Sequence, residues 1–211
     1  MKYFLLLLKI IFPLSIVLII FQFVAFDIGW YKKEFVKYGV FEQLGEERVI
    51  NQTDNLFQYL KGTSSLEGKY YSQKEVLHLQ DVKKILFLTH LTTWVFFIFY
   101  LFFSGVIATK EGMKKYLHYS YRCFIINAFA YVILVIISLA FFNRIFYIFH
   151  TLIFSNDYWL LDPQKELLVI IFPQDIFLDL FIKIIFYSFV ISIAGAVAIK
   201  IFVLKKSQIK I

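Results

Sequence analysis

ILFLTHLTTWVFFIFYLFFSGVIAT, residues 85–109, is the stretch that decides the fold. It carries no Asp, Glu, Lys or Arg, and about 20 consecutive apolar residues are enough for a helix to cross a bilayer. Three similar runs occur at Phe4 to Phe26, Cys123 to Phe142 and Phe181 to Leu204. We therefore predict an all-α integral membrane protein with four transmembrane helices.

The composition agrees with a membrane protein: 60% of the 211 residues are hydrophobic, whereas soluble domains average about 45–50%. A net charge of +7 can indicate a nucleic-acid partner. Here the basic residues collect at the ends of the apolar runs, as the positive-inside rule predicts, so we expect no nucleic acid. The single cysteine, Cys123, excludes an internal disulfide and begins an apolar run, where we expect it to be buried.

The charges of the connecting segments set the orientation. KEGMKKYLHYSYR, residues 110–122, and the tail KKSQIKI are short and basic, which predicts that both lie in the cytoplasm with both termini. Of the 15 acidic residues, only Glu111 falls on that side. The predicted order is an uncleaved signal-anchor helix at 1–26, an extracellular cap at 27–84, spans at 85–109 and 123–142 around the cytoplasmic loop 110–122, a cap or re-entrant segment at 143–180, a span at 181–204 and a tail at 205–211.

The extracellular parts should form a small cap of mixed secondary structure. Residues 27–84 are amphipathic, with nine acidic and nine basic residues. LLVIIF, residues 167–172, ends at Pro173 and is too short to span, so we expect it to dip into the membrane or lie on its surface.

Two of the four histidines, His78 and His150, lie just outside predicted spans on the same side of the membrane. His118 falls in the basic loop, where a solvated position is expected. His90 lies about one turn inside the second span, where a histidine usually hydrogen-bonds a neighbouring helix, although polar groups there can be functional.

SQKEVLHLQDVKK, residues 72–84, surrounds His78. Ser72 followed by Glu75 is a capping-box pattern, which predicts a helix start. Glu75, His78 and Asp81 then recur every three residues on one side of that helix. If the helix runs into the second span, His78 lies about two turns above the span, at a depth similar to that of His150.

FHTLIFSNDYW, residues 149–159, surrounds His150 with Asn156 and a group of aromatic side chains. Aromatic residues are common in interfacial belts. Their density here also suits a pocket for acyl chains beside a polar head group. The candidate wall consists of Phe149, Phe154, Tyr158 and Trp159.

Several chemistries are compatible with two such histidines. Imidazoles with a pKa of about 6.5 can act as acid and base, or each can simply hydrogen-bond within the cap. Zinc needs three or four ligands, and without an HExxH motif or a cysteine cluster we expect no metal. A bis-histidine haem would need a deeper pocket, and the absence of a GxSxG motif argues against a serine nucleophile.

Two stretches of the chain resemble the lipoprotein intramolecular transacylase family, Lit, of low-GC Gram-positive bacteria. KEVLHLQDVK, residues 74–83, is similar to the family pattern E-x-x-H-x-x-D-V, with Leu79 where methionine is expected. FHTLIFSNDYWLLDPQKELLVIIFP, residues 149–173, is similar to its F-H…F-x-N-x-x-W…P…P pattern. The expected layout of four spans with an external cap agrees as well, so the resemblance covers essentially the whole chain.

The resemblance implies a reaction. Such enzymes move the sn-2 acyl chain of a diacylglyceryl-cysteine lipoprotein to the α-amine of its N-terminal cysteine, giving the lyso-form lipoprotein. Catalytic roles then fall to His78 and His150, with Glu75 or Asp81 fixing a histidine tautomer and Asn156 donating to the oxyanion. We expect no cofactor, a diacylated lipoprotein and membrane lipid as partners, a monomer, and a multi-pass protein of the bacterial cell membrane with its active site on the extracellular face. The alternatives are a non-catalytic membrane chaperone or assembly factor, and a haem-binding membrane subunit.

Overall fold

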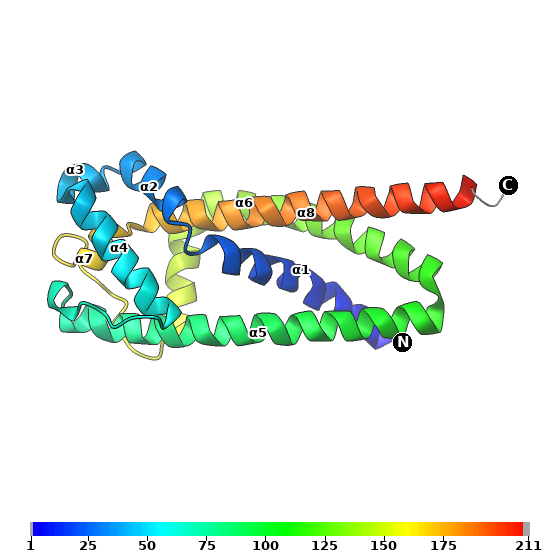
Figure 1. Cartoon of the computed structure of the whole chain (residues 1–211), viewed down its shortest axis with the longest axis horizontal. Helices are drawn as coiled ribbons and strands as arrows, with labels where there is room; N and C mark the ends of the chain where they lie inside the picture. The colour runs from blue at the N-terminus through cyan, green and yellow to red at the C-terminus, as the bar shows by residue number, and fades with distance from the viewer. Residues whose placement is uncertain (1, 209–211) are drawn as a thin grey trace. The chain divides into compact units, whose positions relative to one another are not determined.

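The computed structural model describes residues 2–208, with side chains from residue 9 to residue 203, and it is built from helices (Figure 1). Met1 of the first predicted span and 209–211 of the predicted tail lie outside the described residues. The elements in chain order are α1 (Lys2–Val24), α2 (Ile28–Lys37), α3 (Val40–Leu44), α4 (Glu46–Lys61), the 3₁₀ turn η1 (Gly68–Tyr70), α5 (Gln73–Glu111), α6 (Met113–Ile153), α7 (Leu167–Ile171) and α8 (Gln174–Gln208).

The all-α prediction is confirmed, but the expectation of a mixed cap is wrong. No strand occurs within residues 2–208. The reason is visible in α4, where Val49, Leu56 and Phe57 are buried at positions i, i+7 and i+8. This spacing places the apolar side chains on one face of a helix, so the segment buries them without forming a sheet.

Three helices, α5, α6 and α8, are long and apolar enough to cross a membrane. The described part of α1, Lys9–Val24, counts as a fourth span only together with α2, to which it is bent by 80°. Helix α2 carries Lys32, Lys33, Glu34 and Lys37, which are unusual inside a hydrocarbon layer. A first span made by α1 alone therefore stays a prediction.

The chain divides into two compact units. The first comprises Met1–Gln22, His90–Ile137 and Ile182–Ile211, and the second comprises Phe23–Thr89 and Ser138–Phe181. The first unit contains most of the long apolar runs. The second contains both residues of the histidine pair, so the candidate site can be described within one unit.

Close helix packing holds the first unit together. Phe12 of α1 stacks on Tyr100 of α5, and its ring meets Phe124 of α6 edge to face, with ring centroids 5.1 and 4.7 Å apart. A Cβ atom at Gly195 of α8 would lie 2.4 Å from the Phe124 ring. Any larger residue would require the Phe124 ring to shift, in keeping with the small residues found where membrane helices approach closely.

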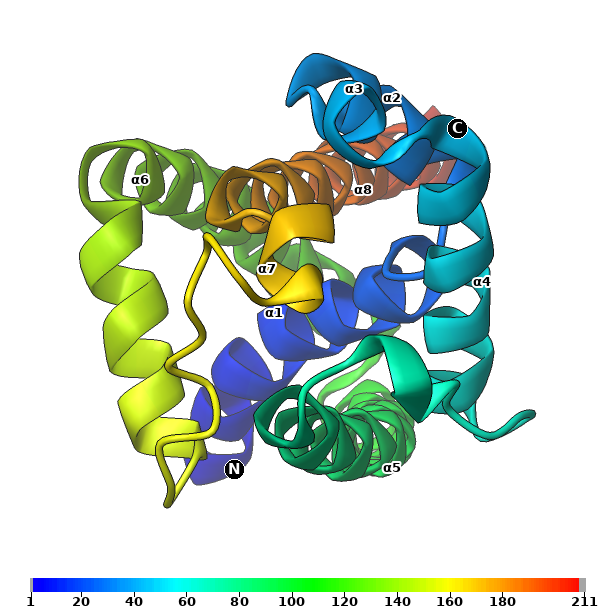
Figure 2. The same cartoon turned by 90° about the vertical axis from the view of Figure 1, so that its left-hand side faces the viewer.

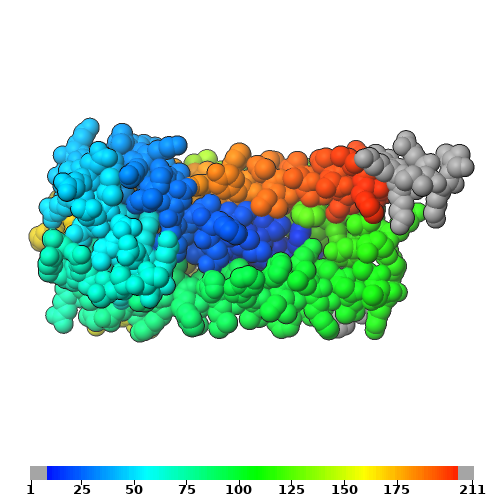
Figure 3. Space-filling model, in the orientation of Figure 1, coloured from blue at the N-terminus to red at the C-terminus, as the bar shows by residue number. Residues whose placement is uncertain are grey.

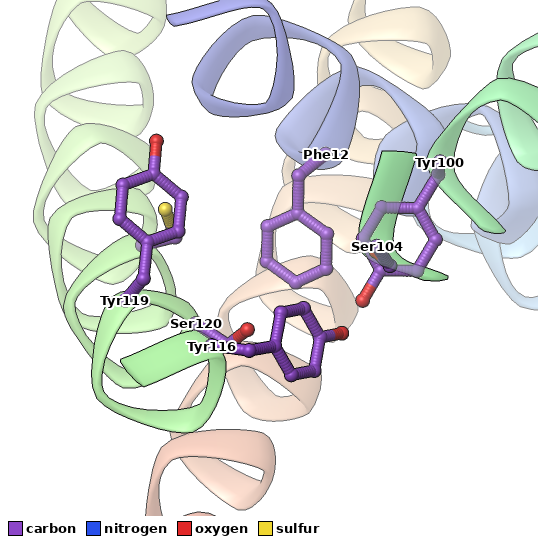
Figure 4. A pocket seen from close by; sticks show the side chains of 7 residues that line it. Phe12, Tyr100, Ser104, Tyr116, Tyr119 and Ser120 are labelled. Atoms are coloured by element: carbon purple, nitrogen blue, oxygen red, sulfur yellow. The ribbon is translucent and has the colours of Figure 1, made fainter. Parts of the chain in front are cut away.

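A pocket in this unit is lined by hydroxyl groups and aromatic rings (Figure 4). Its lining consists of Phe12, Tyr100, Ser104, Tyr116, Tyr119, Ser120 and Cys123. Cys123 is a buried free cysteine, which confirms the expectation from its apolar run.

The outer face of α5, by contrast, is uncovered in Figure 3 and exposes many large apolar side chains, as a lipid-facing helix does.

The core of the second unit is aromatic. The rings of Tyr31, Phe35, Phe57 and Phe172 pack together with centroids 5.0 to 6.2 Å apart. Short helices reach this core because glycines permit sharp turns between them. Gly45, for example, has a φ of 83° between α3 and α4, a conformation that other residues rarely adopt.

Helix α7 contains the first five residues of the run LLVIIF that the sequence places at the membrane. Its residues Leu167 and Ile171 are buried, and so is the following Phe172. These side chains belong to the protein core of the second unit, and Pro173 follows where the short helix ends. Packing within the protein therefore accounts for the apolar character of this run.

Candidate active site

The site begins at the first turn of α5. The backbone N–H of Ser72 donates to Oε2 of Glu75 at 2.6 Å, and the N–H of Glu75 donates to Oγ of Ser72 at 3.2 Å. This reciprocal pair is the predicted capping box, which is confirmed. From this cap α5 runs without interruption to Glu111, so the helix that carries His78 continues into the predicted second span.

The second part of the site is the end of α6. At Phe141 the backbone leaves helical geometry, with φ −134° and ψ 22°, so α6 bends there (Figure 2). The predicted third span ends at Phe142, one residue later. The turns that follow form the post-kink segment, residues 142–153, which carries His150.

His150 has a defined tautomer. Its Nδ1 lies 2.7 Å from the carbonyl oxygen of Phe146, one turn earlier in the helix. A carbonyl oxygen only accepts hydrogen bonds, so Nδ1 carries the proton and Nε2 keeps its lone pair. His150 can therefore accept a proton at Nε2 without losing the contact that orients its ring.

The two histidines face each other. Their ring centroids are 6.3 Å apart, with 34° between the ring planes, and both side chains are buried. Nδ1 of His78 is buried without a hydrogen-bond partner. The sequence predicted that these residues could meet, and within the second unit their rings lie close together; their depth in a membrane stays a prediction.

Aromatic rings surround the pair. Phe154 lies 5.0 Å from His78 and 5.5 Å from His150, measured between ring centroids. Trp159 lies 5.0 Å from His150, and Phe149 meets the same ring edge to face at 5.3 Å. Three of the four predicted wall residues thus contact a histidine.

The fourth, Tyr158, is exposed. Its ring is in contact with neither histidine in the described part of the chain, although its backbone N–H donates to Oδ1 of Asn156 at 3.0 Å. Tyr158 belongs to the loop after α6 and does not pack against His78 or His150. Of the four residues predicted for the wall, the other three surround the histidines, and their role in holding an acyl chain stays a prediction.

Glu75 has a different place from the one expected for an orienting carboxylate. Besides accepting from Ser72, it accepts the backbone N–H of Leu168 through Oε1 at 2.6 Å, and it is almost fully buried. Both carboxylate oxygens are therefore used by backbone groups and not by a histidine nitrogen. Glu75 fastens the start of α5 to the start of α7, and it orients His78 only through its helix.

Asp81 and Asn156 also bind each other. Nδ2 of Asn156 donates to Oδ2 of Asp81 at 2.9 Å, while Oδ1 of Asp81 lies 3.5 Å from Nζ of Lys84. This contact holds the loop after α6 against α5. One N–H of the Asn156 amide is thus occupied, which leaves the other for the predicted oxyanion contact.

Further hydrogen bonds tie residues 154–166 to the same helix start. Lys74 donates to the carbonyl oxygen of Leu160, and Ser72 Oγ donates to Glu166 at 3.2 Å. Asp162 accepts the N–H of Gln164 and pairs with Lys165, and these partners lower the pKa of its carboxyl group. Asp162 is therefore a turn residue in this loop.

The remaining histidines lie elsewhere. His90 is in the first unit, where Nδ1 is 3.2 Å from Oε1 of Gln22 and Nε2 accepts from Trp94 at 3.1 Å. This confirms the interpretation of His90 as a hydrogen-bonded helix-packing residue. His118 is exposed near the start of α6, as expected of a solvated position.

Sequence reasoning missed two contributors. Phe146 packs on His150 with ring centroids 4.2 Å apart, and its carbonyl oxygen fixes the tautomer. Its position one helical turn before His150 is the only signal that could have indicated it. Glu166, which binds both Ser72 and the backbone N–H of Asp162, had no signal in the sequence.

Among residues 2–208 no three histidine, cysteine, aspartate or glutamate side chains gather as a metal site would require. The arrangement instead offers two neighbouring imidazoles, one with a fixed tautomer, inside an aromatic enclosure. Such a pair can move protons between two atoms of a bound molecule.

Known proteins share this fold. The family model described as lipoprotein intramolecular transacylase Lit matches residues 6–177. The solved structure of the membrane integral lipoprotein intramolecular transacylase Lit from Bacillus cereus superposes with a TM-score of 0.80 and 22% identity, over 98% of this chain and 97% of that one.

Two variants of the Bacillus cereus protein, with one histidine replaced by alanine or arginine, give TM-scores of 0.78 and 0.79 at 21% identity. Each match covers 98% of this chain, together with 95% of the alanine variant and 93% of the arginine variant. A search of curated proteins gives no significant match. At this level of identity the structural matches show a common fold, and the family match covers most of the chain.

Proposed function

The chain belongs to the Lit family of lipoprotein intramolecular transacylases, and from that premise we propose that it converts a diacylglyceryl-cysteine lipoprotein to the lyso form. In this reaction the sn-2 acyl chain moves from glycerol to the α-amine of the N-terminal cysteine. The observation that carries the proposal is the facing pair His78 and His150, with ring centroids 6.3 Å apart.

The reaction closes a ring. When the cysteine nitrogen attacks the ester carbonyl, the ring passes through the carbonyl carbon, the ester oxygen, two glycerol carbons, sulfur, Cβ, Cα and nitrogen. Holding both ends of such a flexible molecule together can contribute about 7–11 kcal/mol in favourable cases. The enzyme needs only to position these groups and to move one proton, so no covalent acyl-enzyme is required.

We assign the base to His150. As the nitrogen–carbon bond forms, the amine loses a proton, and Nε2 of His150 is the atom with a free lone pair. The hydrogen bond from Nδ1 to the Phe146 carbonyl also stabilises the imidazolium that results, because the donor becomes more positive. This is the role that an oriented general base requires.

We assign proton return to His78. The tetrahedral intermediate collapses when the bond between the carbonyl carbon and the glycerol oxygen breaks, and that oxygen must gain a proton. Nδ1 of His78 is without a partner, so this imidazole can accept a proton on one nitrogen while the other donates. The proton removed from the amine thus reaches the glycerol hydroxyl, and both histidines return to their starting state.

The surrounding residues hold the substrate. Phe154 and Trp159 form the apolar wall against which the transferred acyl chain packs, since both rings adjoin the histidines. Asn156 uses one N–H to hold Asp81 and offers the second to the oxygen that becomes negative in the intermediate.

The charge pattern sets the cellular arrangement in this proposal. The acidic residues, all but Glu111, lie in the segments that we place outside, and the short basic segments lie inside. The protein would then be a multi-pass monomer of the bacterial cell membrane with α1 as the first span. The histidine pair would lie on the extracellular face, where mature lipoproteins are found.

The test uses purified protein in lipid vesicles and a synthetic diacylglyceryl lipopeptide with a deuterated sn-2 chain. Tandem mass spectrometry should find the deuterated chain on the cysteine nitrogen, with an unlabelled chain left on glycerol. Transfer of the sn-1 chain, or transfer between two peptide molecules of different mass, would overturn the proposal.

A further inference from the structure

The post-kink segment, residues 142–153, exposes apolar side chains on nearly every side. Leu152 is 78% exposed, and Ile145, Tyr147, Ile148 and Ile153 are exposed as well. Phe146 and His150, one turn apart, are the two positions from 143 to 153 that are not exposed. The segment therefore packs on the rest of its unit mainly along the ridge of Phe146 and His150, with Tyr147 in contact with Trp159 beside it.

The sequence of this segment is free of charge over a long stretch. From Ile145 to Asn156 there is no acidic or basic residue, and Arg144 and Asp157 mark its two limits. In water such a helix would present an apolar surface that soluble monomers avoid. A protein partner would cover one face of the helix, whereas here the apolar side chains point in several directions.

We propose that the post-kink segment lies among the acyl chains at the surface layer of the bilayer, so that the lipid itself covers its apolar side chains. The segment continues α6, which is one of the three helices able to cross a membrane. After the kink its turns extend roughly 18 Å at about 1.5 Å per residue, which is too short for a hydrocarbon core of about 30 Å. It therefore lies within one leaflet and does not cross.

The contrast with α7 supports this assignment. LLVIIF is as apolar as the post-kink segment, but Ile171 is 0% exposed and Leu167 is buried in the protein core. The run expected at the membrane is thus covered by protein, whereas the helix beside His150 is not covered. The ring pair of Tyr147 and Trp159, 5.4 Å apart, adds the amphipathic aromatic groups that favour the membrane interface.

One consequence rests on the proposed function. If the post-kink segment is surrounded by acyl chains, the ridge that carries His150 is next to the layer that holds the chains of a lipidated substrate. The sn-2 ester can then approach the imidazole by moving sideways in the leaflet. The acyl chain need not leave the membrane during the transfer.

The test measures the surroundings of the segment by spin labelling. The native cysteine is first removed by Cys123→Ala. Single cysteines introduced by Leu152→Cys or Ile148→Cys then carry a nitroxide label. The control is Lys165→Cys, because the Lys165 side chain is 80% exposed. The labelled proteins are placed in phosphatidylglycerol–phosphatidylcholine vesicles. Power-saturation EPR then compares collisions with oxygen, which concentrates in lipid, and with a water-soluble nickel chelate.

We expect the ratio of oxygen to nickel accessibility to be several-fold higher at positions 148 and 152 than at position 165. Equal ratios at the three positions, or a higher nickel accessibility at 148 and 152, would overturn the lipid assignment. The EPR measurement does not depend on catalysis, so the two proposals can fail separately. Lipid-exposed labels in a protein that transfers no acyl chain would contradict only the proposed function. Water-exposed labels in an active protein would contradict only the lipid assignment.

Discussion

His78 and His150 are equally buried, both 8% exposed, but they are held in different ways. The post-kink segment fixes the His150 ring directly, through the Phe146 carbonyl and the rings of Phe146 and Phe149. The start of α5 fixes the helix of His78 through the capping box, while Nδ1 of that ring has no partner. This difference fits the roles that we propose, with His150 as the oriented base and His78 as the group that returns the proton.

The largest effect is expected at the two rings themselves. His78→Ala and His150→Ala should each lower the transacylation rate by roughly 10²–10⁴-fold, because each removes a proton-transfer group. The double variant should be about as slow as either single variant, because residues that act as a unit are not additive. Rates can be measured by mass spectrometry of the product peptide, with His118→Ala as the matched control.

If the double variant were slower by the product of the two single effects, the histidines would act independently. A slow His118→Ala protein would show that the assay reports stability and not catalysis. Either result would break the division of roles between the two rings.

The next largest effect should be at Glu75, which supports His78 only through the helix. Glu75→Ala leaves the N–H groups of Ser72 and Leu168 without their acceptor, and losing these two part-buried hydrogen bonds should cost about 1–3 kcal/mol in the free energy of unfolding in total. The thermal midpoint in detergent should fall clearly. Glu67→Ala, an exposed carboxylate nearby in the sequence, should leave the midpoint unchanged.

An unchanged midpoint in Glu75→Ala, with loss of activity alone, would contradict this assignment. Glu75 would then act on the chemistry and not on the attachment of α5 to α7. The outcome separates a positioning residue from a catalytic one.

A smaller effect is expected where the loop is tied to α5. Asn156→Ala removes the hydrogen bond to Asp81 and the exposed acceptor of the Tyr158 N–H, and it should cost about 0.5–1.5 kcal/mol in stability, together with any stabilisation of the oxyanion. Asp157→Ala, the next residue in the chain, is the control. If Asn156 also binds the oxyanion, kcat of Asn156→Ala should fall more than the drop in its thermal midpoint explains. Equal effects of Asn156→Ala and Asp157→Ala would contradict both the tie to Asp81 and the oxyanion contact.

The smallest effect should come from Trp159→Phe. The substitution keeps an aromatic ring near His150 but loses area, and aromatic pairs contribute about 0.5–1.5 kcal/mol beyond burial. We expect a few-fold rise in KM for long acyl chains and little change for short ones. An equal rise for both chain lengths would place Trp159 outside the acyl wall.

Much of this arrangement can be predicted from short-range patterns. Ser72 and Glu75 indicated the helix start because a capping box is local, and the long apolar run after it predicted one continuous helix. The meeting of His78 and His150 followed from equal distances to predicted spans. These inferences succeed because helical periodicity is visible in the sequence.

Contacts between distant segments could not be predicted in the same way. The bond from Leu168 to Glu75 joins residues far apart in the chain, and nothing local indicates it. LLVIIF is wholly apolar and the post-kink segment is mostly apolar, so composition could not tell which one protein covers. The kink at Phe141, without a proline, likewise has no local signal.

The central claim is that the two histidines move an acyl chain from glycerol to nitrogen within one lipoprotein. The most direct measurement is mass spectrometry of a lipoprotein's N-terminal peptide from cells that express either this protein or its His78→Ala, His150→Ala double variant. We predict an N-acylated peptide with one chain on glycerol for the unaltered protein, and a free amine with two chains on glycerol for the variant. An N-acylated lyso form in both strains that depends on the protein being present would contradict the claim.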